Sequence, residues 1–249
     1  MADTSILTMA VDRKGQVIEM KLLADRLTKQ YKNKIAVDRI SVEFTKGVYG
    51  LLGANGAGKT TFMRMLCGIL APTSGTVTFD GIDSGEEMYR DVLGYLPQDF
   101  GYYPSFTAWD FLMYMSALKG FDKKSAYKRI EELLEFVSLS DVAKKKIKTY
   151  SGGMKQRLGI AQALLNHPKV LIMDEPTAGL DPKERVRFRN VIENAGKESI
   201  VILSTHIVSD VEHIADYILM MKDGRLIFNA PSGEIEGSLE EFYLSEFGD

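Results

Sequence analysis

The feature that most constrains this chain is the octapeptide Gly-Ala-Asn-Gly-Ala-Gly-Lys-Thr at residues 53–60. It fits the pattern G-x-x-x-x-G-K-[ST], which describes a loop that binds phosphate groups. The apolar run 48–52 before it has the length of a buried strand, and residues 60–66 after it lack glycine and proline, as a helix start requires. Strand, glycine loop and helix in this order predict an α/β fold built around a phosphate site.

The residue types in this loop account for phosphate binding. Glycines allow a tight turn in which successive backbone N–H groups point toward one centre, and the following helix adds its positive end. We expect Lys59 to reach the β- and γ-phosphates of a nucleotide and the Thr60 hydroxyl to coordinate Mg²⁺. A glycine-rich turn that matches by chance is the alternative for this motif alone. The expected nucleotide-binding residues are Gly53, Asn55, Gly56, Ala57, Gly58, Lys59, Thr60 and Thr61.

The composition is that of a globular protein without a nucleic-acid-binding character. A chain of 249 residues, with 45% hydrophobic and 26% charged residues, can bury a full core. The net charge of −3 gives no bulk positive charge that would favour nucleic acid. The single cysteine, Cys67, excludes an internal disulfide and suits a reducing compartment, so we expect a packed thiol.

The sequence contains no apolar stretch close to the roughly 20 residues that a membrane helix needs. The N-terminus carries Asp3, Asp12, Arg13 and Lys14 and has no long apolar region, which argues against a signal peptide. We expect residues 1–17 to form a loosely held extension. Any membrane role would then be exerted from the cytoplasm through a partner.

Residues 18–249 show an α/β alternation that a helical segment interrupts. From residue 107 to about residue 148 the hydrophobic period becomes helical, with Thr107 as an N-cap and a second helix after Asp122, so we interpret about 99–165 as an inserted helical subdomain. The lysines of residues 144–148 predict a solvated face, with a site for lipid head groups as the alternative. The expected strands are residues 18–28, 40–45, 48–52, 76–79, 93–96, 170–173, 200–203, 217–221 and 225–228, and further helices are expected at 152–166, after 181–182 and after 238.

A second motif is Val-Leu-Ile-Met-Asp-Glu-Pro at residues 170–176. Four apolar residues that end in two carboxylates predict a buried strand whose carboxyl end reaches a ligand site. Asp174 would hold Mg²⁺ through water, and Glu175 would polarise the water that attacks the γ-phosphate. Acidic residues at strand ends are common, so this motif gains its weight from lying downstream of the phosphate loop.

A third motif, Tyr-Ser-Gly-Gly-Met-Lys-Gln-Arg at residues 150–157, opens a helix with a serine and two glycines. A hydroxyl, glycine N–H groups and a helix N-terminus together form an anion site, although a simple Ser-Gly helix cap is the alternative. Residues 53–60 already cradle one nucleotide. A second phosphate-binding site therefore makes sense if it serves the nucleotide of a neighbouring subunit.

Together the three motifs resemble the nucleotide-binding domain of ABC transporters, and the resemblance covers nearly all of residues 18–249. It implies a P-loop NTPase with a mainly parallel central sheet in a RecA-like core, an N-terminal antiparallel β subdomain and the inserted helical subdomain. It also implies a head-to-tail dimer with two ATP molecules and Mg²⁺. Each ATP would be held by the phosphate loop of one subunit and by Ser151, Gly152 and Gly153 of the other.

Further positions match functional residues of the family. Gln98 matches the loop glutamine that joins Mg²⁺ and water to the helical subdomain, and His206 matches the switch histidine at the γ-phosphate. Tyr31 matches the aromatic residue that stacks on adenine, with an ordinary packing tyrosine as the competing interpretation. Asp181 matches the loop that links the two sites across the dimer. The resemblance thus implies catalytic roles for Lys59, Gln98, Glu175 and His206, and metal contacts for Thr60, Gln98 and Asp174.

The sequence departs from the family signature Leu-Ser-Gly-Gly-Gln at its first and last positions, which are Tyr150 and Met154 here. The Ser-Gly-Gly centre that would meet phosphate is intact. We therefore expect activity, with altered communication between the subunit and its partner.

The resemblance implies an ATPase whose dimer closes on ATP binding and reopens on hydrolysis, passing the motion to separate transmembrane permease subunits. The second ATP-binding subunit is either an identical or a different chain. Residues 150–157, the short tail and residues 238–244 favour the exporter branch for drugs, peptides and polysaccharides. The expected location is the cytoplasmic face of the cell membrane, as a peripheral subunit. A cluster of aromatic residues in the segment after Gln98 predicts a docking groove for a permease.

Two other functions compete with transport. A soluble ABC-type ATPase that acts on ribosomes or DNA is disfavoured by the single domain, the absence of sustained heptads and the acidic balance. A regulator that only binds nucleotide is disfavoured because Glu175 and His206 are both present.

Overall fold

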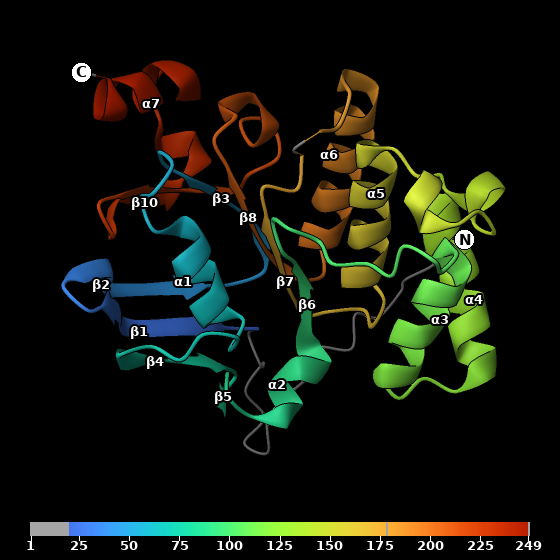
Figure 1. Cartoon of the computed structure of the whole chain (residues 1–249). Coiled ribbons are helices and arrows are strands. Elements are labelled where there is room, and N and C mark those ends of the chain that lie inside the picture. The colour runs from blue at the N-terminus through green and yellow to red at the C-terminus, as the bar shows by residue number, and fades with distance from the viewer. Residues whose placement is uncertain (1–19, 178, 249) are drawn as a thin grey trace, which may run out of the picture.

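The structure, a computed structural model, describes residues 20–177 and 179–248 (Figure 1). The loose extension expected at residues 1–17 lies outside this part. A six-stranded sheet in the order β10-β9-β3-β8-β7-β6 forms the centre, and its neighbours are parallel except for β10 and β9. Its strands are β3 Gly47–Leu52, β6 Leu93–Leu96, β7 Val170–Asp174, β8 Ile200–Thr205, β9 Tyr217–Lys222 and β10 Arg225–Pro231.

A second sheet is antiparallel and has the order β2-β1-β4-β5. It is formed by β1 Leu22–Tyr31, β2 Lys34–Phe44, β4 Ser74–Phe79 and β5 Ile82–Asp83. The two sheets together confirm the predicted fold class, with a mainly parallel central sheet and an antiparallel N-terminal sheet. The turn expected at residues 32–34 joins β1 and β2, although β1 runs past the expected end at residue 28 and β2 begins well before the expected start at residue 40.

The central strands are buried on both faces, which is why their sequences are nearly all apolar. Successive side chains of a strand point to opposite faces, so Leu171 and Met173 join one hydrophobic core while Val170 and Ile172 join the other. One core contains the antiparallel sheet and the first helix. The other contains the remaining long helices.

The helices of residues 108–163 and 182–196 lie on the opposite side of the central sheet from β1, β2 and β4, whereas the helix of residues 59–66 lies beside these strands (Figure 1). Asp181 begins α6 with a capping box that includes Glu184, and Thr107 begins α3 with a box that includes Asp110. Local sequence therefore determines where these helices start. The helices are α1 Lys59–Leu66, α2 Glu87–Val92, α3 Ala108–Leu118, α4 Lys123–Phe136, α5 Gly152–Ala163, α6 Pro182–Gly196 and α7 Leu239–Phe247, with short 3-10 turns η1 Ser140–Val142, η2 Ile147–Thr149, η3 Val208–Asp210 and η4 Ser232–Glu234.

Two helix expectations need correction. The helix expected over residues 152–166 ends at Ala163, and the Arg129 guanidinium of α4 binds the carbonyls of Leu164 and Leu165 just beyond this end. Ser238 caps α7 by accepting from the Glu241 N–H, but no reciprocal bond from the Glu241 side chain is present among the described contacts. The helix α2 was not predicted, since six residues with one buried side chain give no clear period.

Two further expectations concern single features of the chain. The Cys67 side chain is buried, and burial raises the pKa of its thiol well above the usual value, so it is the packed thiol that the sequence predicted. Within residues 20–177 and 179–248, no helix combines the length and the apolar character that crossing a membrane demands.

Candidate functional site

The phosphate loop lies between β3 and α1 and packs closely against two other strands. A Cβ added at Gly58, whose φ is 107°, would lie 2.3 Å from the Ala36 carbonyl oxygen on β2. A Cβ added at Gly53 would lie 2.4 Å from the Met221 carbonyl oxygen on β9. These two glycines are therefore required by close backbone approach, which fixes the loop at the carboxyl edge of the sheet.

Lys59, the first residue of α1, is buried beneath the loop. Its Nζ donates to the carbonyl oxygens of Gly53 at 2.7 Å and Ala54 at 3.2 Å. Burial lowers the pKa of the Lys59 ammonium, while the nearby carboxylates of Glu175 and Asp174 oppose that shift. The loop carbonyls thus hold the lysine ammonium at the floor of a cavity over the loop.

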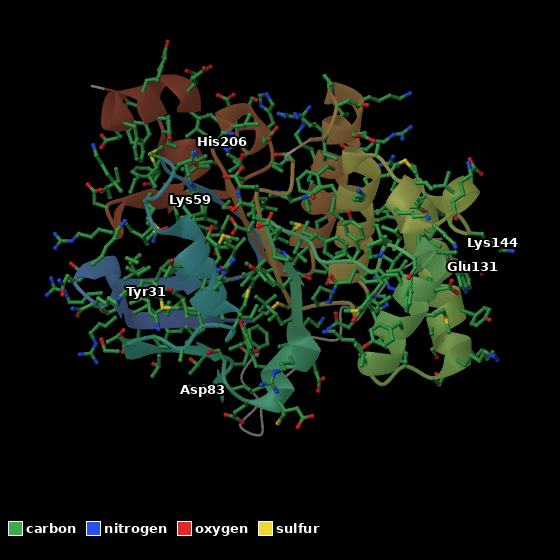
Figure 2. The ribbon with its side chains drawn as sticks, in the orientation of Figure 1. Tyr31, Lys59, Asp83, Glu131, Lys144 and His206 are labelled. Atoms are coloured by element: carbon green, nitrogen blue, oxygen red, sulfur yellow. The ribbon has the colours of Figure 1, made fainter. Side chains whose placement is uncertain are left out.

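A cavity of about 370 Å³ opens over the loop and brings together most of the predicted residues. Tyr31 at the end of β1 lines it from the antiparallel sheet, and Figure 2 shows this residue on that side of the molecule. Lys34 and Ala36 also line it and were not predicted. The remaining lining residues are Asn55, Gly56, Gly58, Lys59, Thr60, Thr61, Gln98, Asp174 and Glu175.

The two carboxylates lie at the end of β7, beside β8. Asp174 is 1% exposed, and its Oδ1 accepts from the Ser204 hydroxyl at 2.6 Å. The Glu175 N–H donates to the Ser204 hydroxyl at 3.0 Å and to the Ser204 carbonyl at 3.2 Å. Glu175 has a φ of 51°, a left-handed conformation that residues other than glycine rarely adopt.

His206 follows β8 and contacts Glu175 directly. Its Nδ1 lies 2.9 Å from Glu175 Oε2, and its side chain is 55% exposed while that of Glu175 is 9% exposed. The Ile207 N–H donates to the Thr205 hydroxyl at 3.0 Å, which holds the turn that presents the imidazole. The histidine therefore lies beside Glu175 and is largely exposed, although it is not one of the residues that line the cavity. Figure 2 places His206 on the same side of the molecule as Lys59.

The residues present fit a magnesium ion. Asp174 Oδ2 is buried and has no hydrogen-bond partner among the described residues, so it is an oxygen free for a cation. The Thr60 hydroxyl and Gln98 line the same cavity and offer further oxygen donors, the type that Mg²⁺ prefers. The described residues contain no group of three or more His, Cys, Asp or Glu side chains that could hold a metal by themselves.

The Ser-Gly-Gly segment stands apart from this cavity, since none of its residues lines it. Ser151 and Gly152 are exposed at the N-terminus of α5, where the Ser151 hydroxyl accepts from the Met154 N–H at 3.2 Å. Gly153 is buried, and a Cβ added there would lie 2.4 Å from Glu184 Oε2. The helix-cap interpretation is thus correct within one chain, and the hydroxyl proton stays available to an outside acceptor.

The departure at Tyr150 has a structural explanation. The ring is buried in the helical segment, and its hydroxyl donates to the Val142 carbonyl at 2.8 Å. Next to it, Arg157 binds Glu184 of α6 at 3.0 Å and the carbonyls of Val137 and Ser138 at 2.8 Å. This arginine joins the end of α4 to α6 through α5, a contact that sequence patterns did not reveal.

A buried network near the site also escaped sequence analysis. Asp210 of η3 is 1% exposed and accepts from the Thr177 hydroxyl and from Arg185 Nη1 at 3.3 Å. It ties the segment after Glu175 to the segment after His206. Its only sequence signal is an acidic residue four positions after the histidine, which is too common to be informative.

P-loop nucleotide hydrolases combine a phosphate loop with a neighbouring strand that ends in acidic residues, both within a parallel sheet. The fold places this chain in that class. A family model described as ABC transporter matches residues 37–178. The solved structure of an ATP-binding subunit of an ABC transporter is similar, with a TM-score of 0.81, 26% identity, and coverage of 90% of this chain and 98% of that chain. The dimeric ATP-binding cassette MJ0796 bound to ADP and Pi has the same fold, with a TM-score of 0.79, 24% identity, and coverage of 85% and 98%.

Several curated proteins are similar in sequence. The ABC transporter ATP-binding protein YxlF of Bacillus subtilis (strain 168) is 41% identical over 216 residues, which cover 86% of this chain and 72% of the relative. The bacitracin transport ATP-binding protein BcrA of Bacillus licheniformis is 40% identical, with coverage of 88% and 74%. The lantibiotic transport ATP-binding protein SrtF of Streptococcus pyogenes is 37% identical, with coverage of 90% and 96%. This chain therefore belongs to the ATP-binding proteins of ABC transporters, and it is an ATPase.

Proposed function

We propose that this protein is the ATPase subunit of an ABC exporter and that it hydrolyses ATP between two subunits. The observation that carries this proposal is the separation of the two phosphate-binding motifs. The cavity at Lys59 lacks any residue of the Ser151 segment, while Ser151 and Gly152 are exposed on α5. A second copy, placed head to tail, would bring one motif to the other.

In this proposal the residues of the cavity have separate roles in binding and hydrolysing ATP. Tyr31 stacks on the adenine ring, the loop N–H groups and Lys59 bind the phosphates, and Glu175 orients the attacking water. His206, which contacts Glu175, donates to the γ-phosphate and helps hold that water. When bound, Mg²⁺ at Thr60, Gln98 and Asp174 would neutralise phosphate charge.

Mixing two inactive variants tests the shared site. Lys59→Met removes the ammonium group that would bind the phosphates of ATP. Ser151→Asp keeps the helix cap and places a negative charge against the phosphate. Each variant alone carries one defect in both sites of its dimer. A mixed dimer gathers both defects in one site and leaves the other intact, so we expect about a quarter of the wild-type rate for an equal mixture if the sites act independently.

The control for this experiment is Ser151→Ala mixed with Ser151→Asp. In this mixture every site carries a defect at Ser151, so no intact site can form. Steady-state phosphate release measures all mixtures. A rate in the Lys59→Met and Ser151→Asp mixture equal to the mean of the two separate variants would show that subunits do not share sites.

Export and the permease partner complete the proposal. Two relatives are named for transport of bacitracin and of a lantibiotic, which supports the exporter branch over action on ribosomes or DNA.

A partly apolar cavity of about 630 Å³ lies between β6, α3 and α5, and Tyr103, Tyr114 and Leu118 on its walls are 48%, 40% and 64% exposed. Exposed aromatic and aliphatic side chains around a hollow suit a helix of a permease. The subunit would thus act at the cytoplasmic face of the membrane.

A pair of matched leucines tests this docking groove. We expect Leu118→Glu to lower transport and co-purification with the permease by about 10-fold or more, because a charge would enter an apolar interface. The ATPase rate of the isolated subunit should stay unchanged. Leu244→Glu is the control, since Leu244 on α7 is 58% exposed but outside the cavity. Equal transport by both variants would place the permease elsewhere.

A further inference from the structure

We propose that Ser204 is a positioning residue that sets both carboxylates of the ATPase site. It is fully buried on β8, between β3 and β7 in the central sheet. The parallel register pairs it with Asp174 on β7 and with Leu51 on β3. Ser204 therefore lies between the strand that leads into the phosphate loop and the strand that ends in the carboxylates.

Its first contact orients Asp174. The Ser204 hydroxyl donates to Asp174 Oδ1 at 2.6 Å, while Asp174 Oδ2 is buried without a partner. The terminal torsion of an aspartate has a broad minimum, so a carboxylate keeps one orientation only when a neighbour holds it. The hydroxyl thus occupies one oxygen and leaves the other for the cation.

Its second contact supports the backbone of Glu175. The Glu175 N–H donates to the Ser204 hydroxyl and carbonyl, and Glu175 itself has the left-handed φ of 51°. Such a conformation persists only where the surroundings hold it. It directs the Glu175 side chain toward His206, which is two residues beyond Ser204 in the chain.

The two contacts depend on each other because they use one oxygen atom. A hydroxyl has one proton and two lone pairs. Since Asp174 Oδ1 takes the proton, the Glu175 N–H can meet a lone pair of the same Oγ. One atom therefore fixes both the oxygen that faces the cation and the carboxylate that orients water. This inference rests on the roles proposed above for Asp174 and Glu175.

The test compares the removal of two buried hydroxyls. Ser204→Ala should lower kcat by about 10- to 100-fold, since a hydrogen bond to a charged group is lost at the site. Binding of metal-free ATP should stay within about 3-fold of wild type, because the phosphate loop is untouched. The matched control is Ser116→Ala: Ser116 on α3 is also fully buried and donates to the Leu112 carbonyl at 2.8 Å. We expect it to leave kcat unchanged.

A second readout does not depend on turnover. In a Glu175→Gln background, where ATP is not consumed, electron paramagnetic resonance can follow Mn²⁺ binding to the ATP-bound protein. Ser204→Ala should weaken Mn²⁺ binding by about 10-fold, because Asp174 loses its fixed orientation. Ser204→Cys is nearly isosteric and keeps a weaker donor, so it should give intermediate losses in kcat and in Mn²⁺ affinity.

The inference is overturned if Ser204→Ala matches Ser116→Ala in kcat and Mn²⁺ affinity. It is equally overturned if metal-free ATP binding falls as much as kcat, since Ser204 would then only support the fold. Should the alanine variant fail to fold, wild-type kcat and Mn²⁺ affinity in Ser204→Cys would overturn it. Full hydrolysis by Glu175→Gln alone would instead contradict the proposed function.

Discussion

Glu175→Gln is expected to reduce ATP hydrolysis by about 100- to 1,000-fold while ATP still binds within about 3-fold of wild type. The amide keeps the size of the carboxylate and cannot polarise the attacking water. The backbone bonds of Glu175 to Ser204 do not involve the side chain, so the local conformation should persist. The loss of one negative charge also reduces repulsion with the γ-phosphate, and we therefore expect the variant to accumulate as an ATP-bound dimer.

Phosphate release and size-exclusion chromatography with Mg-ATP measure these two effects. The control is Glu131→Gln, because Glu131 is exposed on α4 in the helical part of the molecule, well away from Lys59 (Figure 2). It should hydrolyse ATP at the wild-type rate and show no excess of dimer. A Glu175→Gln protein that remains a monomer in saturating Mg-ATP would refute the shared-site proposal, even if its hydrolysis is lost.

Lys59→Met should weaken ATP binding by about 100-fold, because an ammonium that meets phosphate directly makes strong charge-assisted hydrogen bonds. The protein without nucleotide should be no less stable than wild type. Burial lowers the pKa of the Lys59 ammonium, which means that the folded state disfavours its charge, and methionine removes that cost. Thermal unfolding with and without ATP separates the two effects, since ATP should raise the Tm of wild type and not of the variant.

Lys119→Met provides a matched control for that prediction. Lys119 is also a partly buried lysine whose pKa burial lowers, and its Nζ donates to two backbone carbonyls, those of Arg90 and Leu93. It lies outside the nucleotide cavity. We expect Lys119→Met to change the stability of the nucleotide-free protein no more than Lys59→Met does, because burial disfavours the charge of both ammonium groups, and to keep its affinity for ATP. An equal loss of affinity in both variants would mean that removing any buried lysine disturbs the site.

Sequence patterns were informative wherever the chemistry depends on consecutive residues. The octapeptide at residues 53–60, the acidic end of 170–176 and the Asp181 capping box are each local, so spacing alone predicted strand, loop or helix around them. The sequence could not reveal Ser204, because a serine at the end of an apolar strand is unremarkable until β8 is paired with β7. The same holds for Asp210 and Arg157, whose partners lie 19 or more residues away.

The sequence alone determined that the chain has a phosphate loop with its lysine, two carboxylates at a strand end and a Ser-Gly-Gly helix start, since each motif needs only its own neighbours. The tertiary structure decided how these parts meet. Parallel pairing of β3, β8 and β7 aligns their carboxyl ends and places Ser204 between the loop strand and Asp174. The position of the Ser151 helix outside the cavity was also decided by packing, because helix–sheet contacts, rather than local propensity, fix where α5 points.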